Sequence, residues 1–224
     1  MTSGDLVEGL ISLLSPEESQ GLKARGRRRR YPRGSTLFNE GESSDKVVLI
    51  EQGRVKLSFF TDEGQEIMLA LRGAGELIGE LSVLDGEPRS ATATALEDVD
   101  ALVLSAEEFK GFLETTPRVA MKLLQITSRR LRDADDKRIE FGAFDTAGRV
   151  ARRLIELAER FGEASGEGTK IDVALSQQDL AAWTGASREA VSKALQMMRA
   201  RGWIETHRRG VTLLDTDALR RRAR

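Results

Sequence analysis

Residues 176–199 read Ser-Gln-Gln-Asp-Leu-Ala-Ala-Trp-Thr-Gly-Ala-Ser-Arg-Glu-Ala-Val-Ser-Lys-Ala-Leu-Gln-Met-Met-Arg, and this stretch decides the fold of the C-terminal part of the chain. Ser176 with Asp179 three positions later is a capping-box pattern that predicts the start of a helix. Gly185 falls where a tight turn between two helices requires a positive φ, and Ser187 predicts the start of a second helix. Apolar residues recur along the second helix at helical spacing, at Ala190, Val191, Ala194, Leu195 and Met198. The stretch therefore predicts a helix-turn-helix.

The exposed polar residues of the second predicted helix have the chemistry of DNA recognition. Helices of this kind insert their N-terminal end into the major groove. Arg188 can pair with O6 and N7 of guanine, and Glu189 can accept a hydrogen bond from N4 of cytosine. The predicted DNA contacts of this motif are Ser176, Ser187, Arg188, Glu189, Ser192 and Lys193. Ser187 is assigned to phosphate, because it stands at a helix N-terminus.

A predicted hairpin with a basic tip follows the motif. Gly202–Thr206 and Val211–Leu214 flank His207-Arg208-Arg209-Gly210, which is the arrangement of a wing beside a recognition helix. Arg208 and Arg209 join the predicted DNA contacts. Residues 145–224 hold 15 Lys and Arg against 11 Asp and Glu, whereas residues 1–144 hold 20 against 25. This asymmetry indicates that only the C-terminal part meets a polyanion, and it favours DNA over a protein as the target of the motif.

Upstream, short apolar runs alternate with glycine-containing turns from Tyr31 to about Leu104. Their spacing of roughly ten residues predicts a closed or folded-over all-β unit. The predicted strands include Val47–Ile50, Val55–Phe60, Ile67–Leu71, Ala91–Ala95 and Ala101–Leu104. Before this unit, residues 5–25 have helical spacing with a helix start at Ser15, and Arg27–Arg30 is interpreted as a solvated edge that precedes the first strand.

Two helices are predicted after the β unit. Ser105 and Glu108 form a capping-box pattern that opens a short helix, and Pro117 opens a longer one that runs to about Phe141. A heptad seam follows the longer helix: Ala120, Leu124, Thr127, Leu131, Ala134, Arg138 and Phe141. No other segment offers a partner of similar length, so the seam predicts a symmetric homodimer. Packing of this helix on its own β unit is the alternative.

The long helix is expected to end in a break over Gly142–Gly148, after which Asp145 caps a helix from Thr146 to about Phe161. Gly162–Thr169 is interpreted as a polar loop. The fold class is α+β, and the predicted domains are residues 1–116, 117–144 and 145–224.

Gly79–Ser90 reads Gly-Glu-Leu-Ser-Val-Leu-Asp-Gly-Glu-Pro-Arg-Ser, and it is interpreted as short strands and turns that could hold a small phosphorylated sugar. Gly79 allows a close approach of the backbone to a ligand. Arg89 and Ser90 supply donors for a phosphate, and Glu80 can accept from a sugar hydroxyl. A surface turn with a solvated arginine is the alternative.

Composition excludes several classes of function. The chain has no cysteine, which removes disulfides, thiolate catalysis, iron–sulfur clusters and cysteine-based zinc sites, and its one histidine is insufficient for a multi-histidine metal site. We find no nucleophile–base pair, so neither an enzyme nor a resident cofactor is predicted. The lack of a long apolar run and of a secretory signal predicts a cytoplasmic protein.

A β unit, a long helix and a winged helix-turn-helix in this order resemble the cyclic-AMP receptor protein family of bacterial transcription regulators. The resemblance covers nearly the whole chain and is strongest to actinobacterial members, through Gly79–Ser82, Phe144–Ala151 and Gly185–Glu189. It implies an N-terminal jelly-roll-like β-roll that binds a cyclic nucleotide, a dimerisation helix and a winged DNA-binding domain. It also implies a palindromic operator and RNA polymerase as partners.

The same resemblance assigns roles to individual residues. Arg89 and Ser90 would hold the cyclic phosphate, Glu80 the ribose 2′-hydroxyl, and the backbone of Gly79–Leu81 would line the pocket. Arg130 matches a family arginine near the ligand. The positions that contact adenine in cyclic-AMP-binding members are Ala134 and Asp135, where the family has Thr followed by Ser or Asn.

This departure leaves the base undecided. Ala134 has no hydrogen-bonding group in its side chain, and Asp135 accepts but does not donate. Cyclic AMP is the first expectation, with cyclic GMP, cyclic di-GMP and a ligand-independent regulator as alternatives. The nucleotide would act as an allosteric effector that sets the spacing of the two recognition helices through the segment Gly142–Asp145.

Overall fold

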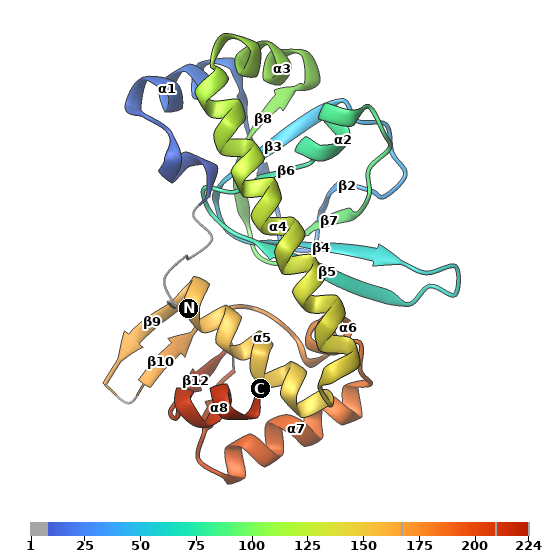
Figure 1. Cartoon of the computed structure of the whole chain (residues 1–224), viewed down its shortest axis with the longest axis vertical. Helices are drawn as coiled ribbons and strands as arrows, with labels where there is room; N and C mark the ends of the chain where they lie inside the picture. Colours follow the sequence, from blue (N-terminus) through green and yellow to red (C-terminus); the bar gives the residue numbers. More distant parts are fainter. Residues whose placement is uncertain (1–8, 167, 209, 224) are drawn as a thin grey trace. The chain divides into compact units, whose positions relative to one another are not determined.

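The computed structural model describes residues 9–166, 168–208 and 210–223 (Figure 1). Contacts divide the chain into two compact units, Met1–Arg132 and Asp133–Arg224, and the division falls inside the helix α4 (Pro117–Ala143). The three-domain division at residues 116 and 144 stays a prediction. None of the described helices is both long and apolar enough to cross a membrane.

The first unit contains two four-stranded antiparallel sheets (Figure 1). One sheet, in the order β1-β8-β3-β6, consists of β1 (Arg27–Tyr31), β8 (Val99–Ser105), β3 (Lys46–Gln52) and β6 (Leu77–Ile78). The other, in the order β2-β7-β4-β5, consists of β2 (Thr36–Phe38), β7 (Thr92–Ala95), β4 (Val55–Phe60) and β5 (Glu66–Arg72). The predicted all-β unit and its strands are therefore confirmed.

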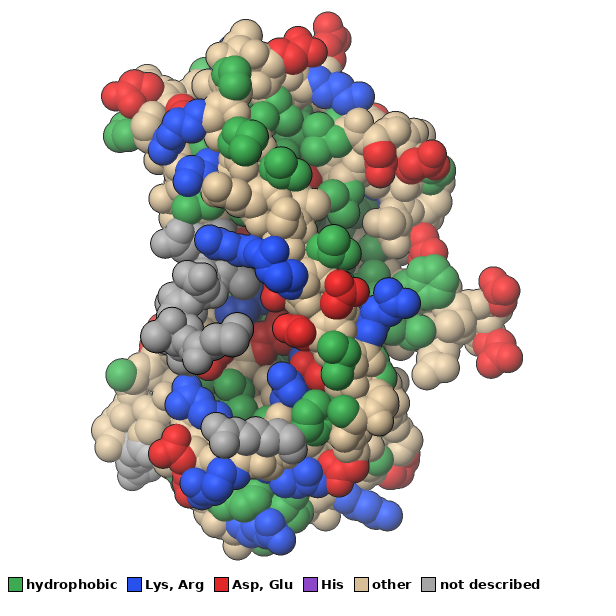
Figure 2. Space-filling view, viewed as in Figure 1, with side chains coloured by type: hydrophobic (Ala, Val, Ile, Leu, Met, Phe, Trp, Pro, Cys, Tyr) green, Lys and Arg blue, Asp and Glu red, His purple; other side chains and the backbone are tan. Residues whose placement is uncertain are grey.

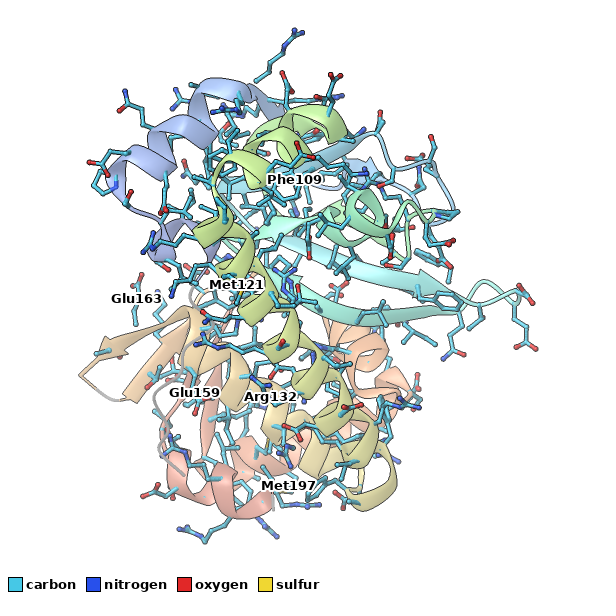
Figure 3. All side chains as sticks on the ribbon, turned by 45° about the horizontal axis from the view of Figure 1, so that its top comes forward. Phe109, Met121, Arg132, Glu159, Glu163 and Met197 are labelled. Atoms are coloured by element: carbon cyan, nitrogen blue, oxygen red, sulfur yellow. The ribbon has the colours of Figure 1, made fainter. Side chains whose placement is uncertain are left out.

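The two faces of the first sheet bury different clusters, because successive side chains of a strand point to opposite faces. Val48, Ile50 and Ala101 belong to a cluster that also contains Val55 and Ala93 of the second sheet. The alternate residues join a second cluster with the helices, which contains Val47, Leu49, Leu102, Leu104, Phe109, Phe112, Val119 and Leu123. Figure 3 labels Phe109, which is fully buried on α3.

Helices α1 (Pro16–Arg25) and α3 (Ala106–Thr115) begin at the predicted serines. Ser15 with Glu18 and Ser105 with Glu108 each form a complete capping box, in which the hydroxyl and the carboxylate satisfy two backbone N–H groups. A short 3-10 helix, η1 (Leu10–Leu13), precedes α1, and residues 5–8 of the predicted helical stretch lie outside the described residues.

Three local predictions are wrong. Arg27–Arg30 does not precede the first strand but forms most of β1, which is held by its pairing with β8. Gly79–Ser90 contains the helix α2 (Glu80–Asp85), bounded by Gly79 and Gly86 in left-handed conformation. Gly162–Thr169 is a hairpin of β9 (Gly162–Ser165) and β10 (Gly168–Ile171), not a loop.

The second unit is a winged helix-turn-helix, as predicted. Its helices are α5 (Thr146–Phe161), α6 (Gln177–Thr184), α7 (Arg188–Ala200) and α8 (Thr216–Arg222), of which α8 was not predicted. Strands β11 (Ile204–Thr206) and β12 (Val211–Leu213) form the wing hairpin, and they continue into β10 and β9 in one sheet. Asp145 caps α5 by accepting a hydrogen bond from Gly148 N.

Candidate functional site

The predicted phosphate-binding arginine is part of the interior of the first unit. Arg89 is 2% exposed; its Nη1 donates to the carbonyl oxygen of Gly79 (2.7 Å) and its Nη2 to that of Lys46 (2.6 Å). Its guanidinium lies over the ring of Phe38, 4.5 Å from the ring centroid, while its buried Nε has no hydrogen-bond partner. Burial lowers the pKa of Arg89, opposed by the charge of Asp45.

Gly79 has to be a glycine at this place. Its φ of 78° lies in the left-handed region, and a Cβ on it would lie 2.6 Å from Arg89 Nη1. Gly79 is also the N-cap residue of α2, so the same residue turns the chain into the helix and receives the arginine.

Glu80 and Arg130 form a buried ion pair in the same unit. Glu80 is 2% exposed and its Oε1 accepts from Arg130 Nη1 at 2.6 Å. Arg130 Nη2 also donates to the carbonyl oxygen of Leu77 (2.9 Å) and lies 3.8 Å from Glu76 Oε1. Arg130 thus fixes the position of the Glu80 carboxylate, whose oxygens are the kind of hydrogen-bond acceptor that a ribose hydroxyl requires.

The remaining predicted ligand residues are exposed. Leu81 is on the outer side of α2, and the Ser90 side chain is in solvent next to the buried Arg89. Ala134 and Asp135 are exposed on α4, where Asp135 Oδ1 lies 4.0 Å from Arg138 Nη1. The structure thus joins Gly79 to Arg89 and Glu80 to Arg130, whereas no described contact ties Ala134 or Ser90 to them.

In the second unit, the helix-turn-helix has the predicted geometry. Ser176 and Asp179 form a capping box, and Gly185 has φ 58° between α6 and α7. The Oγ of Ser187 accepts from Ala190 N (3.2 Å) and caps α7. Both serines accept a hydrogen bond that caps a helix, and their hydroxyl groups also bond to a nearby carboxylate, Ser176 to Asp179 and Ser187 to Glu189.

The first turn of α7 presents its charges to solvent. Arg188, Glu189 and Lys193 are exposed and Ser192 is half-buried, while Val191 and Leu195 on the opposite side are buried. Hydrogen bonds from its own backbone N–H and from Ser187 lower the pKa of Glu189, which keeps the carboxylate an acceptor. The pattern matches a recognition helix with one face in the core and the other free for base edges.

At the wing, the Nε2 of His207 lies 2.8 Å from Thr212 Oγ1, and Arg208 is exposed beside it. The predicted contact Arg209 lies outside the described residues.

The last turns of α4 are bound to the helix-turn-helix. Arg149 donates from Nε to the carbonyl oxygen of Thr184 (2.8 Å) and lies over the ring of Phe141. A Cβ on Gly185 would lie only 2.5 Å from Phe141 Cε1. Arg153, which is 4% exposed, pairs with Glu140 of α4 and with Glu156 of α5.

Sequence reasoning missed the partners of these arginines. Lys46 and Phe38 hold Arg89 from strands 43 and more residues away, and Glu140 holds Arg153 across a helix boundary. No local pattern marks them. A buried guanidinium needs hydrogen-bond acceptors, and this requirement alone predicts that such partners exist.

A two-sheet antiparallel domain followed by a winged helix-turn-helix defines a class of DNA-binding regulators with a separate sensing domain. The family described as "Cyclic nucleotide-binding domain" matches residues 28–116, and "Crp-like helix-turn-helix domain" matches residues 148–222. The chain is 36% identical over 194 residues, 87% of each chain, to a "CRP-like cAMP-activated global transcriptional regulator" of Mycobacterium tuberculosis. It is 37% identical over 192 residues, 85% of each chain, to a "Cyclic AMP receptor protein" of Thermus thermophilus.

Among solved structures, a mutant of CooA from Carboxydothermus hydrogenoformans superposes with a TM-score of 0.79 at 22% identity, over 96% of each chain, and shares the fold. The chain belongs to the CRP family of DNA-binding transcription regulators and carries that family's cyclic nucleotide-binding domain. The resemblance and fold predicted from sequence are confirmed.

Proposed function

We propose that this protein is a homodimeric transcription regulator whose affinity for a palindromic operator is set by a cyclic nucleotide, with cyclic AMP as the first candidate. The observation that carries the proposal is that Glu80 and Arg89 are both buried inside a cyclic nucleotide-binding domain, with Arg130 of α4 paired to Glu80. The relatives in Mycobacterium tuberculosis and Thermus thermophilus are named for cyclic AMP, which supports the choice of nucleotide.

The phosphate would be bound by Arg89 and Ser90. Two of the five N–H donors of Arg89 go to carbonyl oxygens, and the unpartnered Nε leaves donor capacity for a phosphate oxygen. Ser90 offers an exposed hydroxyl directly beside it. The backbone of Gly79–Leu81 would line the pocket, and Glu80, held in place by Arg130, would accept from the ribose 2′-hydroxyl.

The base would be read at Ala134 and Asp135. A carboxylate accepts from the N6 amino group of adenine, and it accepts equally from N1 and N2 of guanine. Asp135 could therefore serve either base, and its carboxylate does not by itself select cyclic AMP over cyclic GMP. Its exposed neighbour Arg138, 4.0 Å away, competes for the same carboxylate in the free protein.

Dimerisation would use α4. Along this helix, large apolar side chains stand exposed in the single chain, among them Leu131 (64%) and Ile139 (65%). Figure 2 shows hydrophobic side chains at intervals along α4, and Figure 3 labels Met121, which is 57% exposed, in its upper half. A helix with such a stripe gains stability by burying it against a second copy.

The DNA contacts would be Arg188, Glu189, Ser192 and Lys193 at base edges and Ser176, Ser187, Arg208 and Arg209 at phosphates. The protein would act by binding, with RNA polymerase as its target on the promoter, and not by catalysis. The nucleotide would favour one arrangement of the paired α4 helices, and the differential affinity of the two arrangements would set the size of the response.

Isothermal titration of the purified protein with cyclic AMP, cyclic GMP and cyclic di-GMP tests the proposal. We expect saturable binding of cyclic AMP at one site per chain and a gain in operator affinity in its presence. Asp135→Ser, which removes the carboxylate that would accept from both N1 and N2 of guanine, should shift the preference toward cyclic AMP, and Arg132→Ser on the same helix is the matched control.

Binding of no cyclic nucleotide below about millimolar would leave a ligand-independent regulator, and the sensor proposal would be abandoned. Sedimentation of Leu131→Glu tests the dimer separately: a monomer is expected, and an unchanged dimer would place the interface elsewhere.

A further inference from the structure

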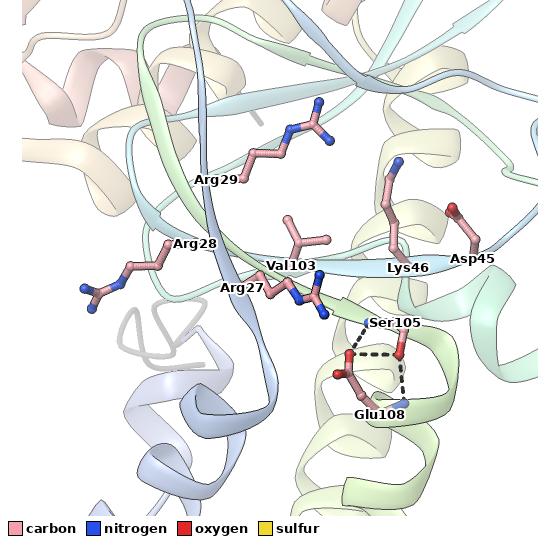
Figure 4. Close-up of a pocket in the computed structure, with 8 residues that line it drawn as sticks. All are labelled: Arg27, Arg28, Arg29, Asp45, Lys46, Val103, Ser105 and Glu108. Carbon is pink, nitrogen blue, oxygen red and sulfur yellow. Dashed lines mark hydrogen bonds between the residues drawn. The ribbon is translucent and has the colours of Figure 1, made fainter.

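A basic groove lies at the open edge of the first sheet, apart from the proposed nucleotide site. Its volume is about 560 Å³, and its lining comes from the start of β1, the start of β3 and the end of β8 (Figure 4). The lining residues are Arg27, Arg28, Arg29, Asp45, Lys46, Val103, Ser105 and Glu108. Arg27–Arg29, which the sequence predicts to be part of a solvated edge, thus form one wall of the groove.

The register of the strands puts two of the arginines on the groove side. Arg27 pairs with Val103 and Arg29 with Ala101, and Val103 and Ala101 face the interior cluster between the two sheets. Lys46 pairs with Ser105, two residues beyond Val103, so it projects from the same face. Figure 4 shows Arg28 directed to the other side of β1.

The arginines of the opposite face have protein partners. Arg28 Nε lies 3.2 Å from Glu51 Oε2, and Arg30 Nη2 lies 2.9 Å from Asp98 Oδ2. Across the described part of the chain, no ion pair holds Arg27, Arg29 or Lys46. The alternation of side chains along β1 therefore places the ion-paired Arg28 and Arg30 on one face, and Arg27 and Arg29, which have no ion pair, on the other.

The two acidic residues of the groove are engaged elsewhere. Both carboxylate contacts of Glu108, with Ser105 N and Ser105 Oγ at 2.8 Å, close the cap of α3. Asp45 Oδ1 faces the buried Arg89, 3.7 Å from its Nη2. Three cations consequently meet over a floor of Val103 and Ser105. Arg29 lies over the ring of Tyr31, and the charges of Arg27 and Lys46 act on Glu108 and Glu42, but no carboxylate of the described residues forms a direct ion pair with any of the three.

We propose that this groove binds the phosphate chain of a small polyphosphate, with Arg27, Arg29 and Lys46 as its charged contacts. Arginine forks and a lysine ammonium are the side chains that bind phosphate oxygens most strongly. The volume falls within the roughly 300–1,000 Å³ of small-ligand sites. Ser105 sits at the floor beside them, and the phosphate chain comes either from inorganic polyphosphate or from a nucleotide that carries one.

The groove also touches the nucleotide site through the backbone. Asp45 and Lys46 stand between the two, since the Lys46 ammonium faces the groove while its carbonyl oxygen accepts from Arg89. The proposal does not depend on the proposed function, because none of its three cations is among the residues assigned to the cyclic nucleotide.

Titration calorimetry of the whole protein with inorganic tripolyphosphate at low salt tests the groove. We expect one site per chain, with an affinity that falls as salt screens the charges. The double variant R27Q/R29Q should lose about a hundredfold in affinity, at about tenfold for each of the two charged hydrogen bonds of roughly 1.4 kcal/mol. R30Q/R33Q removes the same charge at two exposed positions outside the groove lining and should bind within about twofold of the unchanged protein.

Further arms identify the ligand. Adenosine triphosphate that competes and binds more tightly than tripolyphosphate would indicate a nucleotide, and equal affinity would indicate the phosphate chain alone. Arg89→Lys should keep tripolyphosphate binding even where it loses a cyclic nucleotide, which separates the two sites. Absence of binding, equal losses in both double variants, or displacement by hexaglutamate at equal concentration would overturn the proposal; the last result would indicate an acidic peptide surface. Circular dichroism melts confirm that both double variants fold.

Discussion

Glu80 and Arg89, two charged residues assigned to the ligand in the first unit, lie inside the fold, whereas the charged residues of the second unit's recognition helix lie in solvent. Glu80, Arg89 and Arg130 are held by ion pairs and backbone carbonyls. Arg188 and Lys193 on α7 are exposed. In the first unit, the side chains proposed to bind the ligand also form buried contacts that stabilise the fold. In the second unit, the side chains proposed to bind DNA are not part of the core. Substitutions in the first unit should therefore change both stability and ligand binding, whereas substitutions on the recognition helix should change DNA binding alone.

Arg130→Ala should have the largest effect on stability. It leaves the Glu80 carboxylate buried with no cation, and a lost partner of a buried ion pair costs about 3–5 kcal/mol. Urea denaturation measures the loss, with Arg132→Ala, an exposed position of the same helix, as control. A loss below about 1 kcal/mol would show that Glu80 is solvated in solution.

Arg89→Ala should come next. Two carbonyl oxygens, of Gly79 and Lys46, lose a charged donor, which costs about 2–4 kcal/mol in total. The variant should also fail to respond to the cyclic nucleotide. Ser90→Ala, at the exposed neighbour, should change the free energy of unfolding by less than about 0.5 kcal/mol. Equal stability of the two variants would contradict the burial of Arg89.

Arg188→Ala sharpens the comparison from the other side. We expect an unchanged melting temperature and a loss of about 1–3 kcal/mol in binding to an operator selected from random DNA. Fluorescence anisotropy on the selected and on a scrambled sequence gives the difference. Equal weakening on both would mean that Arg188 contacts only the backbone; Gln196→Ala, exposed further along α7, is the control.

The smallest effect is expected at Asp145, the N-cap of α5. Hydrogen bonding from Gly148 N, and then Arg222, lowers the pKa of Asp145 in the folded state. Its stabilisation is therefore fully present above the unfolded pKa of about 3.9 and is lost as the pH falls through the folded pKa. Asp145→Asn should be less stable at pH 7 by under about 1 kcal/mol, because the side chain is largely exposed.

The difference between Asp145→Asn and the unchanged protein should be constant above the unfolded pKa of about 3.9 and should shrink as the pH falls below it toward the lowered folded pKa. Thermal melts at pH 7, 4 and 3 follow it. A constant difference across this range would assign the effect to the geometry of the amide and not to the charge.

Much of the fold could be predicted because its signals are local. Capping serines, the turn glycine Gly185 and the apolar runs of β3 and β4 lie within a few positions of what they determine. The helix α2 was not predicted because six residues are too few for a helical period to appear in the sequence. Strand β1 was not predicted because four consecutive arginines show no alternation of apolar and polar residues. Its strand conformation depends on the pairing with β8.

The candidate site was predicted by residue but not by geometry. Glu80 and Arg130 are separated by 50 positions, and Arg89 and Lys46 by 43, so their contacts depend on the completed topology. Donors and acceptors suited to a nucleotide can be recognised in the sequence. Only the fold shows that Glu80 pairs with Arg130 and that Arg89 donates to the Lys46 carbonyl oxygen.

The contact between Phe141 and Gly185 limits how this regulator can be cut and recombined. Because the ring of Phe141 fills the space that a side chain at 185 would need, and Arg149 ties both to Thr184, the end of α4 is part of the DNA-reading module. A chimera that joins another sensor to this reader should therefore be spliced before Lys137, not in the apparent linker at Gly142–Asp145. Any exchange of the reader alone would have to carry a matched aromatic residue and glycine together.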